Sequence, residues 1–179
     1  MMDEQAASRA ARNAPVVRLR ASRRAMVSPQ ELCALLRDAS WLGSPVDYPE
    51  GGPEVRRYLT DLALPLSAGG GRVEVRKAAY VDIGPIRPTE RGCEVHIAWR
   101  SATLAPLFPV FAGRLWVDAH GLRLDGYYAP PGGRIGMAID RAILHIAARG
   151  TARWFLERVA AAVTVEASLA PHPEAAPGS

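Results

Sequence analysis

Four histidines are the residues of this sequence best suited to acid–base or metal chemistry near neutral pH. They are His96, His120, His145 and His172. No two of them have the HxH or HxxxH spacing that brings imidazoles to one metal ion, so we expect no metal site. His96 alternates with Val95 and Ile97 along a predicted strand. It is interpreted first as a surface residue, then as a polar group of a pocket, and last as a catalytic base. His145 is interpreted as lying at the margin of an apolar helix face, and the alternative is a role in binding or proton transfer.

A second polar set lies near the end of the predicted sheet. Arg123, Asp125 and Tyr127 share one face of a strand, because side chains two residues apart point the same way. Such a trio could orient a polar substrate. The favoured interpretation is a solvent-facing ladder with cross-strand charge pairs.

The sequence matches no other catalytic or cofactor motif. There is no GxSxG, and the glycines at 69–71 are not followed by Lys-Ser or Lys-Thr, so neither a nucleophile elbow nor a phosphate loop is indicated. We expect no cofactor. Cys33 and Cys93 form no CxxC pair and are interpreted as two small buried or half-buried apolar residues, which fits a reducing cytoplasm. No window holds about 18 uninterrupted apolar residues, so no transmembrane helix is predicted.

The positive charge of the chain is concentrated at its start. The formal net charge is +4, and six arginines lie within the first 24 residues, where Asp3 and Glu4 oppose them. The favoured interpretation is a solvated basic arm, and contact with nucleic acid or acidic lipid is the minority alternative. No aromatic residue is interleaved with these arginines, which weakens a claim of single-strand binding. No nucleic-acid partner is therefore predicted, and transient membrane contact stays open.

Composition and length define the organisation of the chain. Its 179 residues are 49% hydrophobic, which fits one globular domain. Residues 1–14 are predicted to be a disordered basic arm, residues 15–166 a single domain, and residues 167–179 a disordered tail rich in Pro and Ala.

The predicted elements are a strand, a short helix, an antiparallel sheet and a long helix. Ser28, Pro29 and Glu31 form a capping box that starts the short helix. The segments that read as strands, about six in all, are 16–27, the hairpin 56–84, 93–102, 111–119 and 122–129. The segment 43–53 reads as a loop because of its Gly and Pro content. Short turns join the strands, so the sheet should be antiparallel.

The last helix is predicted from Ile135 to Val163. Its first half is apolar on two sides, whereas Arg153 and Glu157 replace the isoleucines on one side of its second half. A helix that is apolar on both sides is usually buried on both sides or lies at an interface. The first half is therefore where a ligand or a partner is expected.

Several motifs in the second half of the sequence resemble a known superfamily. They are Trp99-Arg100, Leu107-Phe108-Pro109, Gly113, Gly126-Tyr127 followed by Pro130-Pro131, and Asp140-Arg141. With the order of elements, they resemble the SRPBCC or START-like helix-grip superfamily, which includes polyketide cyclases and coenzyme Q-binding proteins. The closer resemblance is to small uncharacterised bacterial members. It implies an α+β fold in which a curved antiparallel sheet wraps around a long C-terminal helix. That superfamily usually has seven strands and a second short helix, neither of which is evident here.

The resemblance also implies a cavity for an apolar ligand between sheet and helix. Its expected lining is Trp99, Phe108, Phe111, Trp116, Tyr128, Ile139 and His145, with His96, Asp125 and Tyr127 as polar candidates. The leading hypothesis is binding of a lipid, polyketide or isoprenoid-like molecule. The alternatives are a cyclase or dehydratase, an interaction or self-association module that uses the isoleucine face of the helix, and a filled core with no cavity.

Overall fold

Seven strands and one long helix dominate the computed structural model, which describes residues 16–68, 71–103, 110–129 and 141–169. Within them, residues 63–68, 71–75, 141–145, 147 and 164–169 are described by their backbone alone. The strands are β1 (Val17–Arg23), β2 (Ser44–Val46), β3 (Arg56–Ala68), β4 (Gly71–Thr89), β5 (Gly92–Ser101), β6 (Val110–Asp118) and β7 (Gly121–Ala129). The α-helices are α2 (Pro29–Arg37) and α4 (Arg141–Leu169), and two 3-10 helices are η1 (Ala39–Leu42) and η2 (Pro49–Gly51).

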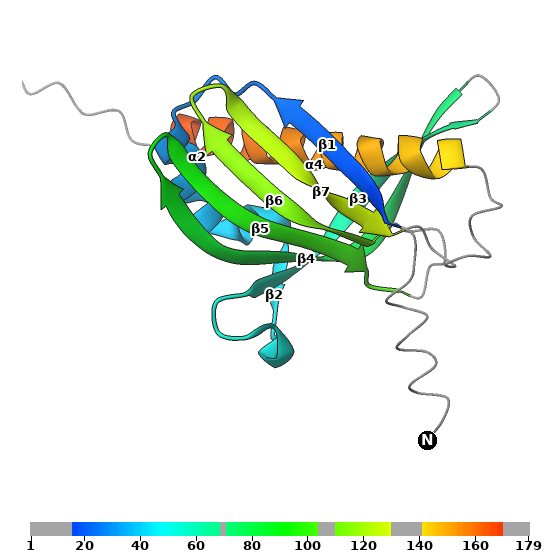
Figure 1. Cartoon of the computed structure of the whole chain (residues 1–179), viewed down its shortest axis with the longest axis horizontal. Helices are drawn as coiled ribbons and strands as arrows, with labels where there is room; N and C mark the ends of the chain where they lie inside the picture. The colour runs from blue at the N-terminus through cyan, green and yellow to red at the C-terminus, as the bar shows by residue number, and fades with distance from the viewer. Residues whose placement is uncertain (1–15, 69–70, 104–109, 130–140, 170–179) are drawn as a thin grey trace, which may run out of the picture.

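The strands form one sheet in the order β1-β7-β6-β5-β4-β3-β2, and every neighbouring pair is antiparallel. A register shift in β4 between Ile83 and Ile86 interrupts the ladder with β5, and such bulges bend a sheet. Figure 1 shows α4 crossing behind the sheet. The helix packs chiefly against β3 and β1, so it lies between the two sides of the curved sheet. This arrangement confirms the predicted α+β class.

Alternation along the strands defines an inner face toward α4 and an outer face. In β5, Cys93, Val95, Ile97 and Trp99 are buried on the inner face, whereas His96 is exposed on the outer face. The same period-two pattern was visible in the sequence, because burial of one face selects apolar residues at alternate positions.

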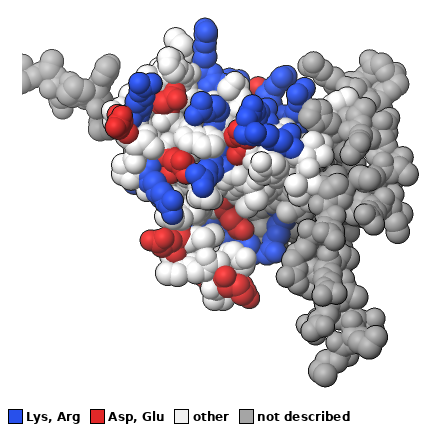
Figure 2. Space-filling view, in the orientation of Figure 1, with Lys and Arg blue, Asp and Glu red and all other residues white. Residues whose placement is uncertain are grey.

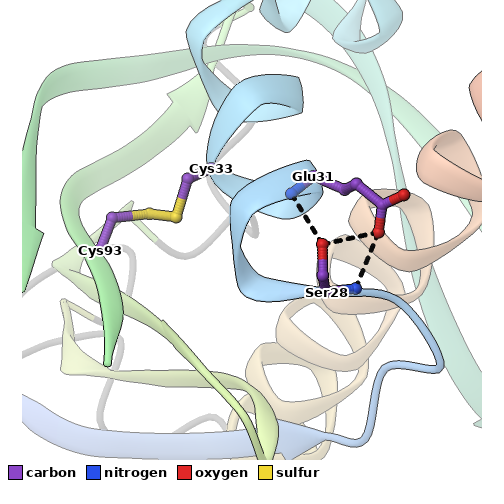
Figure 3. Close-up of a disulfide and its surroundings, with 4 residues drawn as sticks. All are labelled: Ser28, Glu31, Cys33 and Cys93. Atoms are coloured by element: carbon purple, nitrogen blue, oxygen red, sulfur yellow. Dashed lines mark hydrogen bonds between the residues drawn. A yellow bond between two sulfur atoms is a disulfide. The ribbon is translucent and has the colours of Figure 1, made fainter. Parts of the chain in front are cut away.

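Helix α2 begins at the predicted capping box (Figure 3). The Ser28 hydroxyl accepts a hydrogen bond from the Glu31 backbone N–H at 3.2 Å, and the Glu31 carboxylate accepts one from the Ser28 N–H at 2.9 Å. The bond from the Ser28 hydroxyl also lowers the pKa of Glu31. Behind this cap, α2 buries Leu32, Leu35 and Leu36, each of which contributes about 1.5–3 kcal/mol relative to an exposed side chain.

The two cysteines were expected to be separate apolar residues, and the structure corrects this prediction. Cys33 of α2 and Cys93 of β5 form a disulfide with Cα atoms 6.2 Å apart, as Figure 3 shows. Disulfides are rare in reducing compartments. The cysteines therefore no longer support the predicted cytoplasmic location.

Four predicted features differ from the structure. Strand β1 ends at Arg23, four residues before the predicted end at Val27. The segment 43–53, predicted as a loop, contains β2 and η2, and β2 raises the number of strands from about six to seven. Strand β4 continues to Thr89 through the segment interpreted as a turn. Helix α4 continues to Leu169, beyond the predicted end at Val163.

The second half of α4 is apolar on one side and charged on the other, as predicted. Phe155 and Val159 are buried, whereas Arg153 and Glu157 are exposed. Along the first half, Ile146 is 53% exposed. Ile135 and Ile139 lie outside the described residues.

Candidate functional site

Three aromatic rings meet between the sheet and α4. The Trp99 ring of β5 stacks on Phe111 of β6 with centroids 4.1 Å apart, and Phe155 of α4 lies 5.7 Å from Trp99 in a tilted arrangement. All three side chains are buried to 1% exposure or less. Because they come from both layers, they fix how the helix sits on the inner face at this level.

The stacked pair belongs to a row of residues that crosses the sheet. Trp99 pairs with Phe111, and Phe111 pairs with Tyr128 of β7, which is also buried. Two glycines beside this row leave room for the Phe111 ring. A Cβ added to Gly113 or Gly126 would lie 2.6 or 2.7 Å from the Phe111 Cζ atom, too close for any real contact. The row therefore depends on the absence of side chains next to it.

The indole N–H of Trp99 is buried and has no hydrogen-bond partner among the residues that the structure describes. Leaving a buried donor unpaired costs about 1–3 kcal/mol. Such groups are rare in folded proteins, and each calls for an explanation. An ordered water molecule or an acceptor atom of a ligand would supply the missing partner. A donor beside stacked rings is suited to hold a mainly apolar molecule that carries one acceptor atom.

The structure thus brings together three of the predicted lining residues, Trp99, Phe111 and Tyr128. Trp116 is a correction. It lies on the outer face of β6, between the buried inner residues Leu115 and Val117, and so cannot line a space between sheet and helix. Its partner there is Arg123, whose guanidinium carbon is 5.2 Å from the ring centroid.

The remaining predicted lining residues are not placed. Phe108 and Ile139 lie outside the described residues. His145 lies in α4, and its side chain is not described.

The polar candidates lie on the outer face. His96 is exposed, and Tyr127 is 52% exposed. Asp125 accepts two hydrogen bonds from Arg18, at 2.8 and 3.0 Å, and one from Arg20 at 2.9 Å. The bonds from Arg18 lower the pKa of Asp125 to about 2, with a smaller contribution from Arg20. These ion pairs confirm the predicted ladder of cross-strand charges. Because the polar candidates lie on the outer face, the sheet separates them from Trp99 on the inner face.

One buried charge was missed by sequence reasoning. Arg57 of β3 is 6% exposed, donates two bonds of 2.6 and 2.7 Å to Asp82, and lies 3.1 Å from the centroid of the Tyr48 ring. The bonds to Asp82 raise the pKa of Arg57. The contacts attach the segment before β3 to the outer face, so we interpret this cluster as structural. The alternation of the hairpin indicated its face but not its partners.

Among the described residues, no group of three or more His, Cys, Asp or Glu side chains is placed to hold a metal ion. Within the same part of the chain, no helix has the length and apolarity needed to cross a membrane.

Fold and interior together define an α+β protein of helix-grip architecture, with an aromatic row between sheet and helix and an indole N–H that has no partner in the described part of the chain. Among solved structures, the chain is similar to DynU16, a protein of the dynemicin biosynthetic locus, at 17% sequence identity and a TM-score of 0.36. The match covers 84% of this chain and 48% of DynU16, so the chain spans about half the length of that protein. No protein-family model and no curated protein matches the chain.

Proposed function

We propose that this protein binds a small, mainly apolar molecule with a hydrogen-bond acceptor, between the inner face of the sheet and α4. The observation that carries the proposal is the buried Trp99 N–H without a partner among the described residues. An acceptor on a ligand would remove the cost of this unpaired donor, and the neighbouring rings would bury the ligand's apolar part.

The surrounding framework supports such a role. The disulfide joins α2 to β5, the strand that carries Trp99, and Phe155 holds α4 against the same ring. A rigid frame lowers the entropy lost when a ligand is bound. The resemblance to the SRPBCC superfamily agrees with this proposal, and lipids, polyketides and isoprenoids are the ligand classes that it suggests.

The cyclase or dehydratase alternative has less support. His96 and Asp125, two of its acid–base candidates, lie on the outer face, and Asp125 is held by Arg18 and Arg20. An enzyme of this class would need an acid–base group on the inner side, and among the described side chains no His, Asp or Glu is buried.

Fluorenone and fluorene provide a matched test, because they share a ring skeleton and differ in one carbonyl acceptor. We expect wild-type protein to bind fluorenone about 3- to 10-fold more tightly, the range that one net hydrogen bond supplies. Trp99→Phe keeps an aromatic ring but removes the donor, so it should abolish this preference while it still binds fluorene. Isothermal titration and native mass spectrometry measure both affinities.

Trp116→Phe is the control, because it makes the same chemical change on the outer face. It should leave both affinities unchanged. The proposal fails if neither compound binds folded wild-type protein, or if Trp99→Phe retains the full preference for fluorenone.

A further inference from the structure

The outer face of β1, β7, β6 and β5 carries arginine and aromatic side chains in rows across the strands. The register places Ser22, Arg123, Trp116 and Glu94 in one row, Arg20, Asp125, Arg114 and His96 in the next, and Arg18 opposite Tyr127 in a third. Directly opposed side chains on such a face lie about 5 Å apart. Residues from four separate segments therefore form one continuous surface, which we call the arginine face.

The charges on the arginine face do not cancel. Asp125 is shared by Arg18 and Arg20, and Glu94 pairs with Arg114 at 3.1 Å. Arg123 has no carboxylate partner among the described residues, and its guanidinium lies over Trp116. Four arginines and two carboxylates leave a net charge of +2. Figure 2, in the orientation that looks onto these strands, shows the positive side chains gathered there with fewer negative ones between them.

A hollow lies within this face. Its volume is about 730 Å³, and its lining comprises Arg18, Arg20, Ala21, Ser22, Trp116, Arg123 and Asp125. Tyr127, beside it on β7, is 52% exposed. Trp, Tyr and Arg are the residues most enriched at the energetic centres of protein–protein interfaces, because they combine large contact area with directed hydrogen bonds.

The size of the net charge indicates which partner fits. A net charge of +2 neutralises about two phosphates, so binding to nucleic acid would be weak at physiological salt. A protein segment with two carboxylates beside an apolar side chain would balance this charge of +2. Its apolar side chain would also contact the Trp116 ring. Arginine forks bind carboxylates in a bidentate manner.

From these observations we infer that the arginine face is a docking surface for an acidic segment of a partner protein. Carboxylates of that segment pair with Arg123 and Arg20, and an apolar side chain packs on Trp116 in the hollow. The site is separate from the proposed ligand site, since it lies on the opposite face of the sheet.

A short fluorescein-labelled peptide of alternating Glu and Leu tests this inference by fluorescence anisotropy. We expect it to bind wild-type protein more tightly than its Gln–Leu counterpart and more tightly than a labelled oligothymidylate of equal length. Arg123→Glu reverses a charge that no described carboxylate neutralises, so it should weaken peptide binding by at least about fivefold. Trp116→Ala should weaken it independently of charge.

Arg153→Glu is the matched control, because Arg153 is exposed on α4 and the charge change is the same. It should leave peptide affinity unchanged, and circular dichroism should show that all variants are folded. The inference is overturned if the peptide does not bind, if the Gln–Leu peptide binds equally well, if oligothymidylate binds more tightly, or if Arg153→Glu weakens binding as much as Arg123→Glu.

Discussion

Asp125 shows how a single residue of the outer face links charge to stability. Arg18 and Arg20 hold its carboxylate in the charged form, and its pKa is lowered from 3.8 to about 2. A carboxyl group with a lowered pKa in the folded state stabilises the fold above its unfolded pKa, and this contribution is lost as the pH falls toward its folded pKa.

We therefore expect Asp125→Asn to flatten the pH dependence of stability between about pH 4 and about pH 2. Thermal unfolding at low ionic strength over this range measures the effect. Asp47→Asn, a change at an exposed carboxylate, is the control and should keep the wild-type pH profile. Because both arginines are exposed, added salt should reduce the difference. Identical profiles for Asp125→Asn and wild type would show that the ion pairs add nothing to stability in solution.

At the scale of elements, the close approach of β6 and β7 determines the geometry of the aromatic row. Gly113 and Gly126 oppose each other across these strands, and Phe111 lies over both. A methyl group at either position would meet the ring and also a backbone carbonyl oxygen of the facing strand, that of Asp125 at 2.5 Å for Gly113 or that of Ala112, closer still, for Gly126. The strand pair and the stack of Phe111 on Trp99 would therefore have to shift.

We expect Gly126→Ala to lower the free energy of unfolding by roughly 1–3 kcal/mol, the usual cost of overpacking, and to change the near-ultraviolet circular dichroism of the tryptophans. Urea denaturation gives the first quantity. Gly84→Ala is the comparison, because its added methyl would face the His96 Cβ at 3.1 Å on the outer side. A near-ultraviolet spectrum that Gly126→Ala leaves unaltered would contradict the proposed role of this glycine.

At the scale of the whole molecule, the disulfide joins residues 60 positions apart and couples α2 to the sheet. Closing a loop of that length in the unfolded chain corresponds to about 4 kcal/mol at 25 °C. Measured losses on removing a disulfide are typically about 2–4 kcal/mol.

We expect the double variant Cys33→Ala, Cys93→Ala to lose roughly 2–4 kcal/mol of unfolding free energy. Urea denaturation of oxidised wild-type protein with and without a reductant provides the internal control, since the reduced protein should approach the double variant. Equal stability of oxidised and reduced protein would show that the bond does not constrain the unfolded chain.

The sequence by itself determined the local features of this protein. Alternation from Cys93 to Trp99 predicted which face of β5 is buried, and Ser28 with Glu31 predicted the start of α2. Both signals are local, because a strand repeats every two residues and a capping box spans four. The alternation of apolar residues along β6 could also have placed Trp116 on the outer face, since Leu115 and Val117 flank it. The large size of the tryptophan ring suggested a core residue instead.

What only the tertiary structure decided depends on segments far apart in sequence. The disulfide requires α2 to pack beside β5, and the pairing of Asp125 with Arg18 requires β1 to return to β7. Strand β2 consists of Ser44, Pro45 and Val46, and these residues form a strand only because they pair with the edge of β3. The Trp99 N–H, which has no partner among the residues described, is a further example, because no sequence pattern reports the absence of a partner. Such features depend on contacts between distant segments, and a local pattern contains no information about them.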